Sequence, residues 1–460
     1  MDDIVKALIT VLGKHKVLLG TAVKERYHHI WHTDTPLHAK AVVLPRTTEE
    51  VAAILKICHQ YNQQVLVHGG LTNLVGGTET NGEELIISME KMNSIEEVDA
   101  KSRTMTVQAG VLLENIQQAA KEQDLLFPLN FGAKGSAQIG GAISTNAGGL
   151  RVFRFGMTRN LVLGIEAVLA DGTIISSLKK IIKDNSGYDL KQLFIGSEGT
   201  LGIVTKAVLK LSEAPKSRNS AFVAFNDYDK VVDFLKFMDS GLAGTLSGFE
   251  LMWKSTYQAL TSPPASVKPP MPYDYKYYVL LESLGSDQEQ DREKLQGLLE
   301  QALREQLILD AILAHTTSDL EWFWTIREDV HVLVANCTHD QHFDISLPIP
   351  MIGKLTNQFV AAIEQLPKIE IVYAFGHVAD GNLHLIVGKE VLDEILTKKI
   401  NDIVYPPLQA IGGSVSAEHG IGLHKKPYLH ICRTPAELQL MKTLKQAMDP
   451  KGILNTGRIF

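Results

Sequence analysis

The amino-acid sequence predicts an α+β protein of two or three domains. A βαβ unit begins the regular part of the chain, three glycine-rich loops joined by strands follow it, and strands alternate with helices from residue 217 to 400. At 460 residues the chain is long enough for each domain to bury its own core. The composition shifts after Pro215. We therefore expect domains at 1–215, with its core at 38–215, and at 216–410, then a C-terminal segment at 411–460.

Composition and charge narrow the classes of function. Hydrophobic residues make up 45% of the chain, and the formal net charge of −7 argues against a nucleic-acid surface. The sequence has no apolar run of about 18 residues that would predict a membrane span, and its acidic start does not resemble a signal peptide. Cys58, Cys337 and Cys432 are odd in number and far apart, so neither a disulfide framework nor a metal cluster is expected. Buried thiols and a reducing, cytoplasmic location are expected instead.

The first regular elements predict a βαβ unit. Residues 1–35 are mixed and favour helix, and residues 41–45 predict a short strand. Thr47 and Glu50 have the spacing of a capping box, and apolar residues at helical spacing follow them. Residues 64–67 predict the second strand of the unit.

The later elements follow from the same periodicities. Asp171 and Gly172 are typical turn residues and predict a hairpin between strands at 161–169 and 173–175. The other predicted strands lie at 203–211, 221–225, 277–281, 343–348 and 369–376, and the helices at 228–239, 291–305, 319–334, 351–365 and 435–447.

The first glycine-rich loop, residues 68–77, follows the strand at 64–67. Glycine lets successive backbone N–H groups approach a pyrophosphate closely, and such a nest binds an anion without a basic side chain. A Rossmann dinucleotide site is not favoured, because Gly69 and Gly70 are adjacent and no helix is expected after them. An ordinary glycine-rich turn explains this segment about equally well.

The second glycine-rich loop, residues 140–149, is small or polar throughout, so neither a helix nor a core strand is expected there. Its backbone should lie flat against a planar group, and its amides suit the polar edge of an isoalloxazine ring. A third loop covers residues 196–202. Three such loops joined by strands favour a site wrapped around a large cofactor.

These loops also contain long motifs: Gly135-Ser136 with Ile139-Gly140-Gly141, Thr145-Asn146-Ala147-Gly148-Gly149, and Ile195-Gly196-Ser197-Glu198-Gly199-Thr200-Leu201-Gly202-Ile203-Val204-Thr205. They resemble the vanillyl-alcohol-oxidase type, or PCMH-type, FAD-binding family in its D-lactate and D-2-hydroxyglutarate dehydrogenase branch. The resemblance runs from about residue 40 to Phe460. It implies a PCMH-type FAD-binding domain, an α+β FAD-linked oxidase C-terminal domain that binds substrate, and a C-terminal segment that returns to the flavin.

The resemblance also implies which residues contact FAD. In the family the first loop holds the pyrophosphate, the second passes the flavin ring, and the strand matching 198–204 lies along the adenine. We expect non-covalent FAD, since His68 precedes the glycine pair and the family's tethering histidine follows it; the first loop departs from the family pattern at His68, Leu71 and Asn73. The expected contacts are His68, Gly69, Gly70, Leu71, Thr72, Asn73, Gly76, Gly135, Ser136, Gly140, Gly141, Thr145, Asn146, Gly148, Gly149, Glu198, Gly199, Gly202, Ile203, Val204 and Asn455.

A second candidate site lies in residues 375–387. With Asp380 and Gly381 as the two residues of a tight turn, His377 pairs directly with His384 on one side of a hairpin. Directly opposed residues have Cβ atoms about 4.5–5.5 Å apart, which suits two imidazoles on one metal ion. Two solvent-facing histidines are the alternative from geometry alone.

A small-residue loop after residue 411 places Glu418 beside His419. Two histidines and one carboxylate suit Zn²⁺ or Mn²⁺ and leave positions open for substrate. The resemblance implies that His377, His384 and Glu418 bind metal and that His419 is the catalytic base. An exposed polar loop is the alternative for the last two residues.

The resemblance also implies substrate contacts. Arg327 matches the family's carboxylate-binding arginine, and His331 lies one turn further along the same predicted helix. The 2-hydroxyglutarate enzymes hold the second carboxylate of the substrate with a Thr, a Lys and an Asn. At the matching positions this chain has His331, His342 and Ile386. Asn382 is the remaining expected substrate contact. An isoleucine does not bind a carboxylate, which favours a monocarboxylic acid.

The sequence thus predicts FAD-dependent, metal-assisted oxidation of a small D-2-hydroxy acid, D-lactate-like, to the 2-oxo acid, with hydride transfer to flavin N5. Electrons would pass to a soluble carrier or a quinone, and a homodimer is expected from the family. The alternatives are a D-2-hydroxyglutarate or glycolate dehydrogenase, an oxidase that uses O₂, an FAD enzyme acting on a sugar lactone or other alcohol, and a non-catalytic binding protein.

Overall fold

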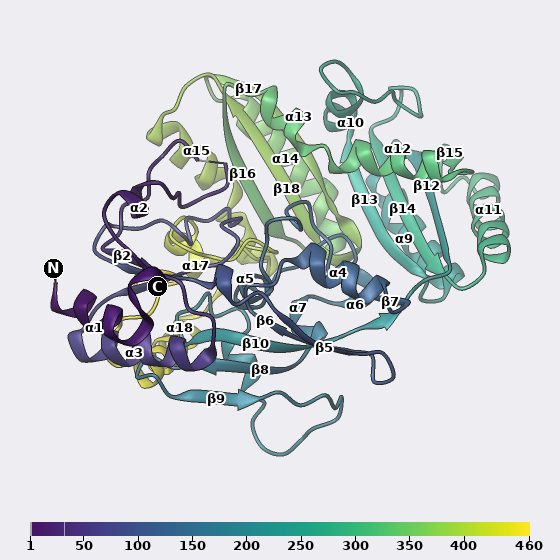
Figure 1. The fold of residues 1–460 in the computed structure, drawn as a ribbon. Coiled ribbons are helices and arrows are strands. Elements are labelled where there is room, and N and C mark those ends of the chain that lie inside the picture. Colours follow the sequence, from purple (N-terminus) through teal and green to yellow (C-terminus); the bar gives the residue numbers. More distant parts are fainter. Residues whose placement is uncertain (1, 32) are drawn as a thin grey trace. The chain divides into compact units, whose positions relative to one another are not determined.

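The computed structural model describes residues 2–31 and 33–460, so Met1 and His32 of the expected N-terminal helical region lie outside the described residues. The chain divides into two compact units, each with helices and sheets (Figure 1). Unit 1 consists of the residues up to Gly149, Gly156–Ala214 and Glu418–Phe460. Unit 2 consists of Leu150–Phe155 and Pro215–Ala417. Among the described residues, no helix is long and apolar enough to cross a membrane.

The predicted βαβ unit is present in unit 1. A four-stranded sheet has the order β1 (Val17–Leu18), β2 (Ala41–Val43), β4 (Leu85–Ser88), β3 (Val65–His68), and β4 lies between the two predicted strands and parallel to both. Helix α3 (Thr48–Tyr61) begins where predicted, because the Thr47 side chain accepts the Glu50 N–H. The return bond of the capping box is not made. The Glu50 carboxylate accepts the Arg46 N–H instead.

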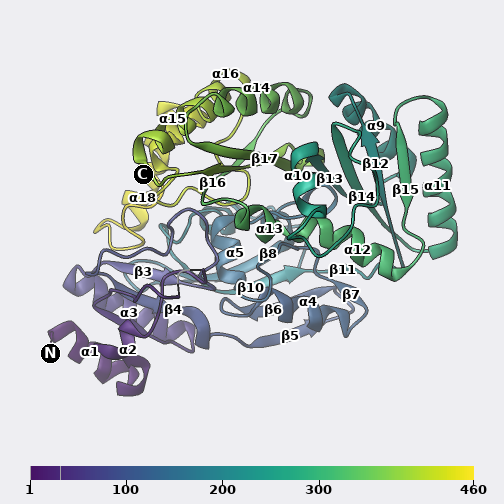
Figure 2. The same ribbon diagram turned by 90° about the horizontal axis from the view of Figure 1, so that it is seen from above.

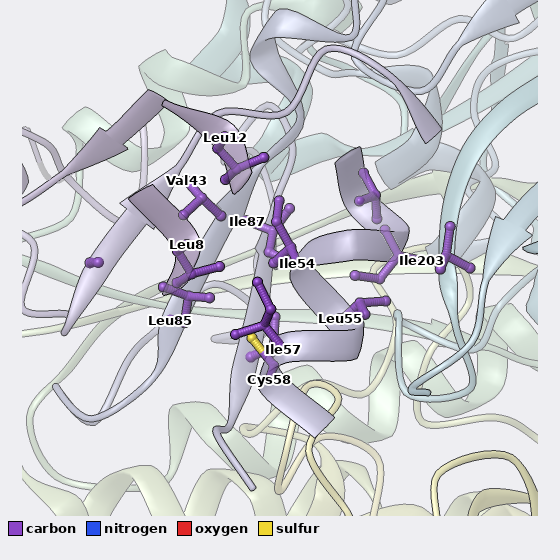
Figure 3. Packing of buried hydrophobic residues seen from close by; sticks show 14 of the residues in the cluster. Leu8, Leu12, Val43, Ile54, Leu55, Ile57, Cys58, Leu85, Ile87 and Ile203 are labelled. Carbon is purple, nitrogen blue, oxygen red and sulfur yellow. The ribbon is translucent and has the colours of Figure 1, made fainter. Parts of the chain in front are cut away.

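The core of this part is formed by α3, its neighbour α1 (Asp3–Leu12) and the parallel strands. Figure 3 shows Leu8 and Leu12 from α1 and Ile54, Leu55 and Cys58 from α3 with side chains of β2 and β4. The side chain of Cys58 is fully buried, as expected, whereas Cys337 and Cys432 are partly exposed.

The second sheet of unit 1 is antiparallel. Its order is β5 (Ile95–Asp99), β6 (Thr104–Gln108), β10 (Ile203–Lys210), β8 (Val162–Val168), β9 (Ile174–Ser177), and the predicted hairpin turn joins β8 to β9. Gly172 has a φ of 89° there, and Asp171 accepts the Thr173 N–H. The remaining elements assigned to unit 1 are α2 (Thr21–Lys24), α4 (Leu113–Lys121), β7 (Leu125–Leu126), α5 (Ile139–Thr145), α7 (Thr158–Leu161), α8 (Lys191–Phe194), β11 (Ser212–Glu213), α17 (Leu429–Cys432) and α18 (Pro435–Met448).

Unit 2 is built on one seven-stranded antiparallel sheet. Its order is β15 (Asp310–Leu313), β12 (Ser217–Phe225), β14 (Tyr277–Gly285), β13 (Leu246–Trp253), β17 (Ile369–His377), β18 (Asn382–Lys389), β16 (His339–Ser346). Helices α10 (Lys254–Thr261), α12 (Thr317–Glu328) and α13 (Val330–Ala335) pack on one face. Helices α9 (Tyr228–Leu242), α11 (Gln288–Arg304) and α14 (Ile352–Glu364) pack on the other (Figure 2). Helices α6 (Val152–Phe155), α15 (Glu394–Val404) and α16 (Pro407–Ile411) also belong to the unit.

One predicted helix of unit 2 is two helices. The segment expected as a single helix at 319–334 is interrupted at Asp329, whose ψ of 53° is not helical. Arg327 therefore lies buried in α12, and His331 lies exposed in α13. The expectation that they occupy one face of a continuous helix is wrong.

Candidate active site

The first glycine loop presents a row of backbone N–H groups. It runs from β3 to β4 without a helix in the described chain, as predicted. The amides of residues 70–74 donate to no acceptor among residues 2–31 and 33–460, and Leu71 is left-handed with a φ of 57°. Gly70 has no room for a side chain, because a Cβ there would lie 2.0 Å from the Ser136 carbonyl oxygen. Such a row of N–H groups forms an anion site and fits a pyrophosphate.

Two side chains of this loop support its shape. His68 is 3% exposed, and its Nε2 donates to the Thr78 carbonyl oxygen at 3.0 Å. Burial lowers the pKa of His68 to about 3, so the ring is neutral. Asn73 Oδ1 accepts the Gly77 N–H at 2.7 Å and the Val75 N–H at 3.3 Å. The contact of these side chains with FAD stays a prediction.

The prediction that the second glycine loop contains no helix is wrong, because its first part is α5. Gly140 lets this helix approach its neighbour, since a Cβ on Gly140 would lie 2.7 Å from Ala109 Cβ. Close packing thus outweighs the low helix propensity of glycine. Asn146, with a φ of 51°, ends the helix, and its Oδ1 accepts the Arg159 N–H.

The surface of α5 is open beside Gly141. A Cβ on Gly141 would meet no atom within 4 Å, whereas one on Gly69 would lie 3.7 Å from Gln138 Oε1 and 3.9 Å from Gly141 Cα. The first two glycine loops therefore meet at these positions. Gln138 Oε1 is buried and has no hydrogen-bond partner in the described chain. An orphaned acceptor between two glycine surfaces, next to a row of N–H groups, fits a large polar cofactor such as FAD.

The third loop is fixed by Glu198. This residue was expected on a strand, but it lies in a turn with a φ of 50°, and β10 begins at Ile203. Its carboxylate accepts the N–H groups of Ile421 at 2.7 Å and Gly422 at 2.8 Å. Burial nevertheless raises the pKa of Glu198 above its ordinary value. The Glu198 side chain thus holds the loop that follows His419.

Asn455 connects the C-terminal tail to the third loop and to β3, the strand that leads into the first loop. Its Nδ2 donates to the Glu198 carbonyl oxygen at 2.6 Å, and its Oδ1 accepts the Val67 N–H at 3.0 Å. All the residues expected to contact FAD lie in unit 1. The third loop and the tail therefore share a hydrogen-bonded framework with the strand that leads into the first loop.

In unit 2, His377 and His384 share a face of the sheet, but the predicted register is wrong. A 3-10 turn (Val378–Asp380) and Gly381 join β17 to β18, and Phe375 rather than His377 lies opposite His384. A shift of two residues keeps a side chain on its face. The two histidine rings therefore still meet, with centroids 5.3 Å apart at 90°, and each offers a nitrogen within 4.8 Å of the other's.

One buried carboxylate contacts both a histidine and the predicted substrate arginine. Glu250 is fully buried on β13, and its Oε1 lies 2.7 Å from His377 Nδ1 while its Oε2 lies 2.8 Å from Arg327 Nε. Burial by itself raises the pKa of Glu250, but the charges of His377 and Arg327 outweigh it and hold that pKa below its ordinary value. Arg327 is 5% exposed, so it is a buried residue and not a surface arginine of an amphipathic helix.

A second buried carboxylate lies beside His384. Asp344 Oδ1 is 3.8 Å from His384 Nδ1 and accepts from Asn382 Nδ2 at 2.8 Å, and Asp344 Oδ2 accepts the Ala417 N–H at 3.2 Å. Asn382, expected to contact substrate, thus uses its amide N–H to hold Asp344. Burial also raises the pKa of Asp380, in the turn after His377, to about 6.

Glu418 and His419 follow Ala417 directly in the chain and belong to unit 1. Glu418 borders the second glycine loop, because a Cβ on Gly148 would lie 2.8 Å from Glu418 Oε1. A carboxylate predicted to bind metal therefore lies beside the loop predicted to pass the flavin ring.

Farther along the histidine face, β18 presents Ile386, which is 1% exposed and pairs with Tyr373 on one side and His342 on the other. His342 Nε2 lies 2.5 Å from Asp340 Oδ2. This part of the face is thus partly apolar, and its one histidine already has a carboxylate partner.

The sequence reasoning missed Glu250, Asp344 and Gln138. Glu250 and Asp344 contact residues far away in sequence, such as His377 for Glu250, 127 positions later, whereas Gln138 Oε1 has no partner in the described chain. A signal existed for Glu250, which is a charged residue inside the apolar run Phe249-Glu250-Leu251-Met252. A buried charge in such a strand indicates a specific partner.

Comparisons with known proteins agree with this geometry. Residues 39–177 match the FAD binding domain family, and residues 214–459 match the family of C-terminal domains of FAD linked oxidases. A putative mitochondrial D-lactate dehydrogenase of Schizosaccharomyces pombe is 39% identical over 89% of this chain and 80% of its own length. A mitochondrial D-2-hydroxyglutarate dehydrogenase of Bos taurus is 40% identical over 91% and 76%. A D-2-hydroxyglutarate–pyruvate transhydrogenase of Saccharomyces cerevisiae is 33% identical over 97% and 92%.

Solved structures show the same fold at low identity. An alkyldihydroxyacetonephosphate synthase superposes with a TM-score of 0.75 at 16% identity, over 99% of this chain and 86% of that one. A p-cresol methylhydroxylase superposes with a TM-score of 0.75 at 14% identity, over 99% and 96%. The predicted PCMH-type fold with an FAD-linked oxidase C-terminal domain is confirmed.

Proposed function

Because this chain belongs to the FAD-linked oxidase family, in its D-lactate and D-2-hydroxyglutarate dehydrogenase branch, we propose that it oxidises a small D-2-hydroxy acid with the help of a divalent metal ion. The chain is an FAD-dependent oxidoreductase. The observation that carries the metal proposal is the pair His377 and His384 on one face of β17 and β18, with the buried Glu250 2.7 Å from His377 Nδ1 and the buried Asp344 3.8 Å from His384 Nδ1. A carboxylate behind a histidine is the usual arrangement at metal sites.

His377, His384 and Glu418 would hold the metal ion, Zn²⁺ or Mn²⁺. Ala417 is hydrogen-bonded to Asp344 beside His384, and Glu418 is the next residue in the chain, which supports its part in this set. When bound, FAD supplies the hydride acceptor and the metal ion supplies a Lewis acid for the substrate hydroxyl. His419 takes the hydroxyl proton as general base. The Nη groups of Arg327, which have no partner in the described chain, bind the C1 carboxylate.

The apolar part of the histidine face around Ile386 supports a monocarboxylic acid similar to D-lactate. Ile386 is buried next to His384 on the same face and offers no donor to a second carboxylate. D-2-hydroxyglutarate is the second candidate, because several relatives are named for it. His342 and His331 would then have to bind the second carboxylate.

The mode of FAD binding and the electron acceptor are also proposals. FAD is bound without a covalent link, and the acceptor is a soluble carrier or a quinone. A homodimer and a cytoplasmic location stay predictions. Gel filtration and cell fractionation test these two.

The test is anaerobic reduction of the bound flavin by a panel of D- and L-2-hydroxy acids, followed by its absorbance. We expect fast bleaching by D-lactate, slower bleaching by D-2-hydroxyglutarate and none by L-acids. Faster bleaching by D-2-hydroxyglutarate would transfer the assignment to the dicarboxylic acid. Bleaching by none of the acids would refute the proposed function. Peroxide release in air would assign an oxidase.

A further inference from the structure

We propose that Glu250 is a positioning residue that couples the metal subsite to the substrate-carboxylate subsite of this enzyme. The inference rests on the proposed function, since it concerns the same site. It is drawn from one carboxylate whose two oxygens are divided between His377 and Arg327.

The position of Glu250 is set by the sheet itself. In the pairing of β13 with β17, Glu250 lies directly opposite His377, and directly opposed side chains are neighbours on one face. The carboxylate is fully buried and has both oxygens occupied. A buried charge with two hydrogen-bonded partners has little freedom to move, so it fixes the orientation of each partner.

Toward the metal, Glu250 fixes the tautomer of His377. Because Oε1 accepts from Nδ1, the ring proton lies on Nδ1 and the ligand lone pair lies on Nε2. A carboxylate in this place also makes the imidazole a stronger ligand. Loss of the carboxylate would free the ring to rotate and to adopt the other tautomer.

Toward the substrate, Glu250 fixes the plane of Arg327. It engages only Nε, while the guanidinium carbon lies 4.9 Å from the centre of the Phe375 ring. The two Nη groups, without partners in the described chain, remain as a fork for a carboxylate. One residue therefore sets both the ligand nitrogen of His377 and the direction of the Arg327 fork.

Glu282 provides a matched control in the same sheet. It is also fully buried and also shared by two cationic partners, here the arginines Arg151, with Nε at 3.1 Å, and Arg218, with Nε at 2.6 Å. It pairs with Gly248, two residues from Glu250 on β13, but contacts neither histidine. Glu282→Gln thus removes a comparable buried charge without touching the site.

The experiment compares Glu250→Gln and Glu282→Gln with wild type as FAD-loaded full-length protein. Calorimetry with Mn²⁺ alone measures metal affinity, steady-state dye reduction measures KM and kcat for the preferred D-acid, and thermal unfolding reports the fold. For Glu250→Gln we expect metal affinity to fall about 10–100-fold, and kcat/KM to fall about 100-fold with a raised KM at saturating metal. For Glu282→Gln we expect a lower Tm with unchanged metal affinity and KM.

Equal effects of both variants, confined to Tm, would overturn the coupling role. So would a fall in metal affinity without a change in KM at saturating metal. If the glutamine variant does not fold, Glu250→Asp retains the charge but is too short to reach both partners, and it should show the same paired loss. Wild type that binds no Mn²⁺ or oxidises no D-acid would overturn the proposed function itself, which separates the two failures.

Discussion

Buried ionisable side chains fix the geometry at the scale of single residues. In unit 2, Glu250 lies beside His377 and Asp344 lies beside His384. In unit 1, Glu198 accepts the backbone N–H groups of the residues beyond His419. Each of these carboxylates is buried. Replacing one of them therefore leaves a charged group or a hydrogen-bond donor without its partner in the protein interior, which lowers the stability of the fold.

His68 makes the first glycine loop sensitive to acid. Its pKa is about 3 in the folded chain and 6.5 for an unperturbed histidine, so the unfolded state binds more protons below pH 6.5. The stability that the neutral ring contributes is present above about pH 6.5 and is lost as the pH falls toward 3, by up to about 1.4 kcal/mol per pH unit.

His68→Gln retains a donor for Thr78 but does not titrate. We expect its Tm and FAD retention to decline less than those of wild type between pH 6.5 and 4, measured by thermal unfolding and flavin fluorescence. Parallel declines would contradict this role of His68.

The sequence pattern predicted correctly which residues share a face of the sheet, but it did not predict the register, that is, which residues lie opposite each other on neighbouring strands. The alternation of side chains placed His377 and His384 on one face, and the structure retains this. The register depends on the length of the turn between β17 and β18. That turn is a 3-10 turn followed by Gly381, which is longer than the two-residue Asp-Gly turn that was predicted. Glu250 could not be assigned to His377 from sequence, because the pairing of β13 with β17 joins strands far apart in the chain.

At the scale of elements, α5 shows why glycine content misled the prediction. A glycine-rich segment was expected not to form a helix. Gly140 nevertheless lies in α5, at a position where the helix packs so closely against Ala109 that no side chain fits. The βαβ unit and the β8–β9 hairpin were predicted correctly, because local capping and turn residues determine them. Packing between distant elements determines α5, and a local pattern does not contain that information.

The neighbouring glycines Gly140 and Gly141 separate packing from cofactor binding. Gly140→Ala would place a Cβ 2.7 Å from Ala109 Cβ, so the free energy of unfolding should fall by about 1–3 kcal/mol. Gly141→Ala meets no protein atom within 4 Å and should raise helix stability by up to about 1 kcal/mol while weakening FAD binding. Urea unfolding of the apoprotein and FAD titration measure the two effects. Unchanged FAD affinity in Gly141→Ala would show that this surface does not face the cofactor.

At the scale of the whole molecule, the end of the chain completes the framework around the predicted FAD loops. Asn455 connects the tail to Val67 and Glu198, 388 and 257 positions earlier. No local pattern predicts such bonds, and the family resemblance placed Asn455 only near the flavin.

Replacing Asn455 tests this framework. Asn455→Ala leaves the Val67 N–H and the Glu198 carbonyl without partners, so we expect a loss of about 1–3 kcal/mol in stability and weaker FAD binding. Thr456→Ala is the control, since its hydroxyl donates only to the Gly452 carbonyl within the tail. Flavin release on heating compares the two. Equal flavin release from both variants would count against a specific role of Asn455.

The proposed activity depends on a metal ion held by residues of two different motifs. The most direct measurement is oxidation of the preferred D-2-hydroxy acid by metal-free protein, prepared with EDTA and verified by elemental analysis, before and after Zn²⁺ or Mn²⁺ is restored. We predict that wild type loses turnover with its flavin spectrum intact and recovers it with metal, whereas His384→Ala does not recover. Full turnover by verified metal-free wild type would contradict the metal site and with it the assigned roles of His377, His384 and Glu418.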